Sequence, residues 1–332
     1  MSETLLRRGP VHQLAWLDRR TLVVADGDGR VEVTDTTTGS VVAASATDRT
    51  VTALAVDSSA GWLAWGDDRG TVELRSSGGR REHTAFREPV DELVWTNRAD
   101  VRPPDLAVSA GHDVVVLAPG GGERAADRLR RPRSMCVAWV RPGLLAAGGN
   151  GGVTFISADG SAPTTPDRMD LLPDLPSPGA VSCVDVDLGG HRLTAGDLRG
   201  EVRITSLQTG EELSLDGLGD RIHSCRWWLD GSLLAIAVDD EVTVWASVPF
   251  DLEPDPVCTV DLAGLATPLV ADRNRRRLAV ADLESWVHRL AYDGSVLDVP
   301  VRVTGQPRCL AWSPDGTTLA AGTDHGLLLL GS

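Results

Sequence analysis

The chain has 332 residues, of which 42% are apolar and 4% aromatic, and its formal net charge is −15. No apolar stretch is long enough to cross a bilayer as a helix, so the composition predicts an ordered chain without a transmembrane helix. The negative charge argues against nucleic acid and against an anionic membrane as partners, because binding either requires a local excess of positive charge.

The basic residues and the first residues of the chain bear on its origin. All 32 basic residues are arginine, a bias that indicates a GC-rich, bacterial coding genome. The segment from Met1 to Pro10 lacks the apolar run of a secretory signal, so we expect the protein in the cytosol.

A repeat of about forty residues runs through the whole chain. The segment Val11–Trp16 has counterparts beginning at Val51, Val90, Ser134, Val181, Ile222, Thr267 and Pro307. Five of the eight copies have tryptophan at the sixth position, namely Trp16, Trp95, Trp139, Trp227 and Trp312. This period is typical of the four-stranded blades of a β-propeller. We therefore predict an all-β fold, a single domain over residues 1–332 with eight blades, with seven blades as the alternative.

The first unit shows the expected strands. Apolar or alternating runs predict strands at 11–16, 22–25, 31–34 and 41–44. The turn between the second and third strands is Asp26-Gly27-Asp28-Gly29, in which glycine supplies positive φ and aspartate accepts bonds from turn amides. The string from Asp26 to Glu32 also resembles a calcium loop, but it lacks the later bidentate glutamate of an EF-hand, so a strand turn is the preferred interpretation.

The last unit supplies only three strands, at 307–312, 319–322 and 327–330. Pairing the segment from Thr4 to Pro10 with these strands would complete the blade and leave no open edge. We therefore expect the two ends of the chain to close the ring.

The segment from Ala311 to Gly322, with Ser313-Pro314-Asp315-Gly316 at its centre, resembles the first hairpin of a WD-repeat blade. The segment from Trp227 to Ala235, followed by Asp240 and Val242–Trp245, is the next best match. The resemblance implies a propeller that binds protein partners on one face. The chain departs from the family pattern because it has no Trp-Asp dipeptide and no Gly-His pair ahead of its first strands, so other propeller families remain alternatives.

No catalytic, metal or cofactor motif emerges from the sequence. The seven histidines lie in different units without HxH or HxxxH spacing, and no GxSxG or glycine-rich phosphate loop accompanies them. Three of the five cysteines, Cys136, Cys183 and Cys309, occupy the third position of a first strand. They are therefore expected as small buried residues between blades, with neither a disulfide framework nor a zinc site.

Arginines and departures from the repeat mark other candidate surfaces. The cluster Arg124, Arg128, Arg130, Arg131 and Arg133 is interpreted as a solvated strand edge and loop, in preference to a phosphate-binding patch, because no aromatic residues are interleaved with it. Two irregular loops, 159–179 and 248–256, are either partner-specific insertions or tolerated surface variation.

Large residues that break the repeat are the candidates for partner binding. Trp65 stands where sister units have alanine, and Trp286 opens a third strand where sisters have Arg30, Thr71, Glu201 and Glu241. Either tryptophan could anchor an interface or pack between blades. The second-strand turns and the loops before the first strands should share one face. On that face arginines (Arg8, Arg49, Arg87, Arg133, Arg221) should alternate with turn acids (Asp28, Asp68, Asp113, Asp197, Asp240, Asp282, Asp324), either to select partners or merely to keep the surface soluble.

Two functional hypotheses remain. The favoured one is a non-enzymatic scaffold that presents its loops to protein partners in a bacterial assembly, signalling or defence pathway. The alternative is a propeller enzyme or small-molecule sensor with a site in the central channel. That site would need ionisable side chains from the starts of the first strands, which are mostly valine, isoleucine, threonine and serine.

Overall fold

The structure is a computed structural model. It describes residues 3–57, 61–76, 79–84, 86–96, 104–118, 123–128, 133–157, 174–228, 231–247, 250, 255–272, 277–291 and 295–331. For residues 79–84 and 123–128 only the backbone is described.

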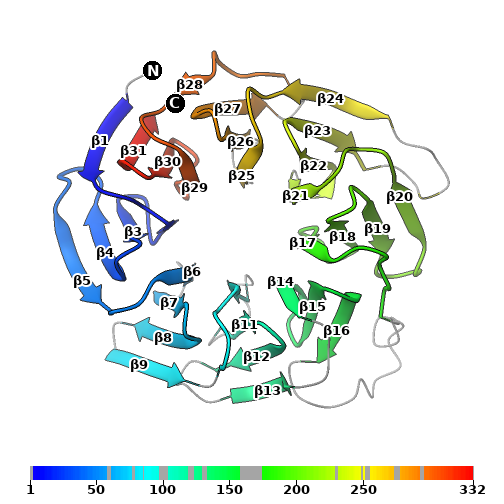
Figure 1. Cartoon of the computed structure of the whole chain (residues 1–332), viewed down its shortest axis with the longest axis horizontal. Coiled ribbons are helices and arrows are strands. Elements are labelled where there is room, and N and C mark those ends of the chain that lie inside the picture. Colours follow the sequence, from blue (N-terminus) through cyan, green and yellow to red (C-terminus); the bar gives the residue numbers. More distant parts are fainter. Residues whose placement is uncertain are drawn as a thin grey trace.

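Eight antiparallel sheets stand around a central axis in chain order (Figure 1). Each sheet is one blade of a β-propeller, and the described residues contain no α-helix. The predicted number of eight blades is confirmed. Seven sheets have four strands, and the described part of blade 4 has three.

The strands of the first four blades are β2 (Gln13–Trp16), β3 (Thr21–Ala25), β4 (Arg30–Asp35) and β5 (Val41–Ala46); β6 (Val51–Asp57), β7 (Trp62–Asp67), β8 (Thr71–Ser76) and β9 (Gly79–Thr84); β10 (Glu92–Trp95), β11 (Leu106–Ala110), β12 (Asp113–Leu117) and β13 (Glu123–Arg128); β14 (Ser134–Arg141), β15 (Leu144–Gly149) and β16 (Gly152–Ser157).

The strands of the last four blades are β17 (Val181–Val186), β18 (Arg192–Asp197), β19 (Val202–Ser206) and β20 (Glu212–Leu215); β21 (Ile222–Trp228), β22 (Leu233–Val238), β23 (Glu241–Ala246) and β24 (Pro256–Asp261); β25 (Ala266–Asp272), β26 (Arg277–Asp282), β27 (Trp286–Ala291) and β28 (Val301–Arg302); β29 (Pro307–Trp312), β30 (Thr318–Thr323), β31 (Gly326–Gly331) and, from the start of the chain, β1 (Glu3–Arg8).

Strand β1 completes blade 8, as the sequence predicted. It pairs antiparallel with β31, from Glu3 opposite Leu330 to Arg8 opposite Gly326, with a register shift between Leu5 and Arg7. The blue and red ends of the chain accordingly share one blade in Figure 1. The ring is thus closed by backbone hydrogen bonds, which removes the open sheet edge that an unclosed propeller would present.

Two of the five recurring tryptophans, Trp16 and Trp139, join neighbouring blades at the ends of the inner strands. Trp16 Nε1 donates to the carbonyl of Ala311 at 3.0 Å. Trp139 Nε1 donates in the same way to the carbonyl of Val94 at 2.9 Å. In both pairs the acceptor is the fifth residue of the preceding blade's inner strand, so the sixth-position tryptophan links consecutive blades.

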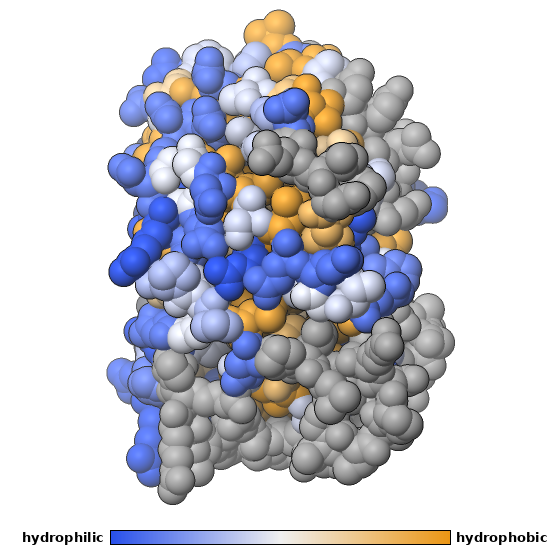
Figure 2. Space-filling view, turned by 90° about the vertical axis from the view of Figure 1, so that its right-hand side faces the viewer, coloured by the Kyte–Doolittle hydropathy of each residue, from blue (hydrophilic) through white to orange (hydrophobic). Residues whose placement is uncertain are grey.

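The core lies in the layers between blades. Leu22, Leu106, Leu145 and Leu193, on the second strands of four blades, are all fully buried. Cys136, Cys183, Cys225 and Cys309 are buried free thiols and Cys258 is half-buried, so the prediction that the first-strand cysteines act as small buried residues is confirmed. In Figure 2, hydrophilic side chains cover the left-hand part of the side in view and a band across its middle, and apolar side chains gather near its centre and at the top.

Candidate functional site

One face of the ring is formed by the turns between second and third strands together with the segments that lead into first strands. We call this the loop face. Contacts within single blades establish it: Thr47 N donates to Gly29 O at 2.9 Å, and Leu283 N donates to Leu265 O at 3.1 Å. The expectation that these two kinds of loop share a face is therefore confirmed.

In four blades, an aspartate binds the turn between the second and third strands to the loop beside this turn. In blade 2, Asp67 Oδ1 accepts from the amides of Arg69 and Thr71 at 2.9 and 2.8 Å, and Oδ2 lies 3.2 Å from Arg49 Nη1. The first oxygen thus satisfies the turn, and the second holds the neighbouring loop. The equivalent aspartates are Asp26, Asp197 and Asp282, whose second oxygens bond Arg7, Ser177 and the amide of Ala263.

This arrangement corrects part of the expected surface charge. Asp197 and Asp282 were predicted as exposed turn acids, but their exposed fractions are 2% and 0%. Turn amides and loop groups surround them because an uncompensated carboxylate would be costly to bury. They hold each turn to the loop beside it and are not available to a partner.

Blades 3 and 4 both lack the turn aspartate. Ala110 and Gly149 stand in its place, and both blades have two-residue turns, at 111–112 and 150–151. In blade 3 a carboxylate from the inner edge substitutes: Asp91 Oδ2 accepts from Gly111 N at 2.8 Å and Oδ1 accepts from Arg133 Nη2 at 3.0 Å.

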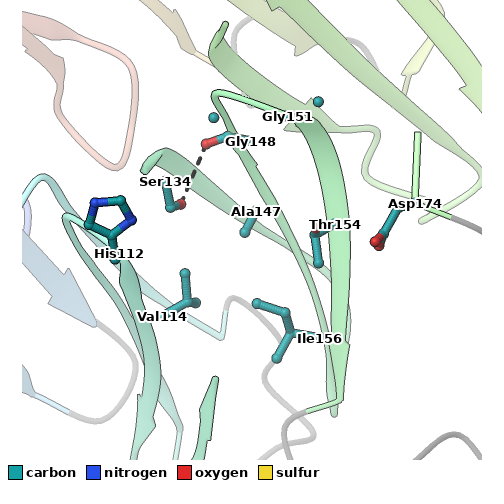
Figure 3. A pocket seen from close by; sticks show the side chains of 11 residues that line it. His112, Val114, Ser134, Ala147, Gly148, Gly151, Thr154, Ile156 and Asp174 are labelled. Carbon is teal, nitrogen blue, oxygen red and sulfur yellow. Dashed lines mark hydrogen bonds between the residues drawn. The ribbon is translucent and has the colours of Figure 1, made fainter. Parts of the chain in front are cut away.

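A cleft of about 190 Å³ opens between these two blades (Figure 3). His112 and Val114 project into it from blade 3, and Thr154 and Ile156 from blade 4. Ser134 lies at its base, where its hydroxyl donates to Gly148 O at 3.4 Å and accepts from the Ser109 hydroxyl at 3.2 Å.

The glycines of blade 4 leave the cleft without side chains along one wall. A Cβ on Gly149 would lie 1.9 Å from Arg133 O, and one on Gly152, whose φ is +104°, would lie 2.0 Å from Leu175 O. Close backbone approach therefore requires glycine at both positions. The cleft combines apolar walls, the hydroxyls of Ser134 and Thr154, the His112 imidazole and, at its outer end, the Asp174 carboxylate.

The structure places the two candidate tryptophans differently. Trp65 is 2% exposed and packs in the layer between blades 1 and 2 with Val23, Val31 and Leu63. Of the two interpretations of Trp65, packing between blades is therefore the correct one, and the ring does not reach the loop face. Trp286 is half-buried on blade 7, with the Arg302 guanidinium 5.8 Å from its ring centroid.

Two exposed leucines share the blade 7 loops with Trp286. Leu265 is 44% and Leu283 37% exposed. We call Leu265, Leu283 and Trp286 the blade 7 patch. Periodicity alone did not identify it, although two leucines in loops of a charged face were visible in the sequence.

Four of the five arginines expected on the loop face, Arg49, Arg87, Arg133 and Arg221, are candidates for partner binding, and they fall into two pairs. Arg49 bonds Asp67 and Thr71, and Arg133 bonds Asp91, so both are engaged within the ring. Arg87 and Arg221 are exposed. Of the predicted arginine cluster only Arg133 has a described side chain; Arg124 and Arg128 lie in β13, and Arg130 and Arg131 lie outside the described residues. Most of the irregular loop 159–179 and part of 248–256 also lie outside them.

The central channel holds a charged cluster that the sequence analysis missed. Glu92 of β10, Asp185 of β17 and Arg226 of β21 line the same cavity. Electrostatic attraction by Asp185 and Glu92 raises the pKa of Arg226 against the effect of burial, and burial raises the pKa of Glu92 to about 6. The starts of the first strands carry no such charges; Glu92 stands at the third position, and Asp185 and Arg226 stand at the fifth. Asp185 and Arg226 occupy the fifth position, where Ala15, Ala55, Ala138 and Ala311 stand in sister strands.

The described residues contain neither a metal-binding group of side chains nor a membrane-spanning helix. No group of three or more histidine, cysteine, aspartate or glutamate side chains there could hold a metal ion. No helix there is long and apolar enough to span a membrane.

Solved structures resemble the chain over nearly its whole length. Sqt1 from Chaetomium thermophilum, solved bound to the N-terminus of the ribosomal protein L10, matches with a TM-score of 0.80 and 14% identity over 98% of this chain and 97% of that one. The C-terminal WD40 domain of Sif2 matches with a TM-score of 0.79 and 13% identity, over 99% of both chains. The fold is that of a WD40 propeller.

The likeness also includes a designed protein. The computationally designed protein Ika8 matches with a TM-score of 0.78 and 14% identity, over 98% of this chain and 97% of that one. At these identities the WD40 propellers are similar to this chain in fold alone. No protein-family model matches the sequence, and no curated protein matches it.

Proposed function

We propose that this WD40 propeller is a non-enzymatic scaffold that binds a protein partner on its loop face, in a bacterial cytosolic assembly, signalling or defence pathway. The observation that carries the proposal is the cleft between blades 3 and 4. It opens where two consecutive blades lack the turn aspartate, so this part of the loop face is not closed by its own side chains.

The chemistry of the cleft suits a segment of polypeptide. Val114 and Ile156 offer apolar contact, while Ser134, Thr154 and His112 offer hydrogen-bonding groups of the kind that orient a bound chain. The blade 7 patch provides a second apolar contact on the same face, and a half-buried tryptophan flanked by leucines is a typical interface anchor. Sqt1, with the same fold, was solved with the N-terminus of a protein bound, which supports a protein as the kind of partner.

The test begins with affinity purification of the tagged protein from its native host and identification of stoichiometric partners by mass spectrometry. The purified partner is then titrated against variants. Thr154→Arg should fill the cleft and weaken binding at least about tenfold, and Trp286→Ala should weaken it if the partner also reaches blade 7. Arg20→Glu, an exposed residue in a turn between first and second strands on the opposite face, is the matched control and should stay within about twofold. Loss on Arg20→Glu with an unchanged Thr154→Arg would contradict the proposal.

A second candidate function is a small-molecule sensor whose site lies in the central channel. The specific observation in its favour is the cluster of Glu92, Asp185 and Arg226, because charged side chains buried together in a cavity are typical of ligand sites.

A further inference from the structure

The central channel contains two cavities that meet at the charged cluster. One, of about 340 Å³, is lined by Asp91, Ser182 and His223 toward the loop face. The other, of about 230 Å³, extends toward the opposite face, where Arg141 and Asp187 line it. Glu92, Val184 and Arg226 line both cavities. The cluster therefore stands between the two ends of the channel.

The two carboxylates are held in place by neighbouring blades. Glu92 Oε2 accepts from the amide of Val137 at 2.7 Å, across the seam between blades 3 and 4. Asp185 Oδ2 accepts from the amide of Trp227 at 2.7 Å, across the seam between blades 5 and 6. Each carboxylate is fixed through one oxygen by the rigid inner ring, so the site is preorganised and pays little side-chain entropy when a ligand binds.

The 230 Å³ cavity carries an excess of negative charge. Its described lining has three carboxylates, Glu92, Asp185 and Asp187, and two guanidinium groups, Arg141 and Arg226. The formal charge of this lining is therefore −1, and its charged residues Glu92, Asp185 and Arg226 are half-buried in a chain whose net charge is −15. Such a site attracts a single positive charge and repels an anion.

The rest of the lining is apolar and aromatic. Val94, Val140, Val186 and the ring of Trp139 form the walls. Trp139 Nε1 already donates to Val94 O, so the ring offers the cavity mainly its apolar surface. Apolar walls and an aromatic ring beside carboxylates are a favourable environment for an ammonium group with a compact apolar body.

We propose that the 230 Å³ cavity binds a small organic cation, a primary ammonium on a compact apolar or aromatic group, with Glu92 and Asp185 facing the positive charge. The inference rests on the second candidate function and leaves the loop-face scaffold independent of it. A small molecule fits better than a protein segment, because the charges that select the ligand lie on inner strands within the channel and not on a loop.

The probe is 2-phenylethylamine, titrated into the full chain by calorimetry. We expect saturable one-to-one binding with a Kd below about 1 mM. The neutral analogue 2-phenylethanol and the anion 3-phenylpropanoate share its apolar body and should bind at least about tenfold more weakly. A bound cation should also lower the pKa of Glu92 from about 6, so titrations at pH 6 in buffers of different ionisation enthalpy should show proton release.

Variants assign the binding to the channel. Glu92→Gln and Asp185→Asn keep an acceptor for the Val137 and Trp227 amides but remove the charge, and each should weaken amine binding about tenfold. Arg226→Gln removes the repelling charge and should strengthen it. Asp48→Asn removes a carboxylate that is 85% exposed outside the channel and is the control. Circular dichroism of each variant verifies folding.

Three results would overturn the proposal: no saturable binding of 2-phenylethylamine, equal binding of 2-phenylethanol, or equal effects of Glu92→Gln and Asp48→Asn. Binding of a lysine-containing peptide such as acetyl-Gly-Lys-Gly-amide without binding of the free amine would likewise replace the small molecule by a protein segment. None of these results bears on partner binding at the cleft between blades 3 and 4, which Glu92→Gln should leave unchanged. Failure of the channel proposal is therefore distinct from failure of the scaffold proposal.

Discussion

The guanidinium of Arg49 lies 3.2 Å from the carboxylate of Asp67, and this ion pair connects the loop before blade 2 to a turn within the same blade. The two partners are not equivalent. Asp67 is buried and also accepts from the amides of Arg69 and Thr71, whereas the Arg49 side chain is 31% exposed. The carboxylate is therefore the centre of the contact.

This asymmetry predicts unequal losses of stability. Asp67→Ala leaves two turn amides and Arg49 without their acceptor and should lower the free energy of unfolding by about 2–3 kcal/mol. Arg49→Ala keeps both amide bonds to Oδ1 and lets water reach Oδ2 where the part-exposed guanidinium stood, so it should cost less than about 1 kcal/mol. Urea unfolding followed by tryptophan fluorescence measures both variants. Equal losses would show that the ion pair, and not the turn, determines stability.

The sequence predicted the fold well because the fold depends on local, repeated signals. Eight inner strands, the turn after Ala25 and the closing strand near Leu5 follow from periodicity and turn chemistry, which each blade repeats independently. The site is not a repeated property. The cleft exists because two adjacent blades have Ala110 and Gly149 in place of the turn aspartate, and the channel cluster exists because charges from blades 3, 5 and 6 meet across the axis. Such convergence depends on three-dimensional neighbours that a single strand does not specify.

Ring closure by β1 can be tested with two adjacent leucines. Leu6 packs against the core of blades 8 and 1, whereas Leu5 is 49% exposed. Leu6→Ala should reduce the free energy of unfolding by about 2 kcal/mol, and Leu5→Ala should stay within about 0.5 kcal/mol. Thermal or urea unfolding of the two variants provides the comparison. If neither substitution changed the free energy of unfolding, β1 would not contribute to the stability of blade 8.

The backbone approach at Gly149 should make this residue intolerant of any side chain. A Cβ there would meet Arg133 O at 1.9 Å, so Gly149→Ala must separate β15 from the strand entry of blade 4 and should cost more than about 3 kcal/mol. Gly210→Ala is the control: its φ is +76°, but nothing lies within 4 Å of its Cβ position, so only the cost of the left-handed backbone, about 1 kcal/mol, remains. Soluble yield and urea unfolding distinguish the two variants. Similar losses in the free energy of unfolding for Gly149→Ala and Gly210→Ala would contradict a steric cause.

The cysteines should react with thiol reagents in an order set by burial. Burial raises the pKa of Cys309 to about 12 and that of Cys136 well above its ordinary value, so neither forms a thiolate near neutral pH. Cys258 is half-buried on the outer strand β24. Treatment of the folded protein with iodoacetamide at pH 8, followed by peptide mass spectrometry, should therefore modify Cys258 first and Cys309 only after unfolding. Prompt modification of Cys309 would show that blades 8 and 1 separate readily.

The channel carboxylate Glu92 should impose a pH dependence on stability that its amide variant lacks. Burial raises its folded-state pKa from 4.5 to about 6. Between these values the folded protein binds more protons at Glu92 than the unfolded chain does. The contribution of Glu92 to stability therefore decreases as pH rises through the window and reaches its minimum above pH 6. Glu92→Gln, measured against the parent by urea unfolding, should become relatively more stable by about 2 kcal/mol between pH 4 and pH 7.

Asp315, whose pKa the hydroxyls of Thr317 and Ser313 lower to about 2, titrates below this window. Glu88→Gln removes a carboxylate on the loop face and serves as the control. A constant difference between Glu92→Gln and the parent across the range would mean that Glu92 has the same pKa in the folded and unfolded states, as a well-solvated carboxylate would.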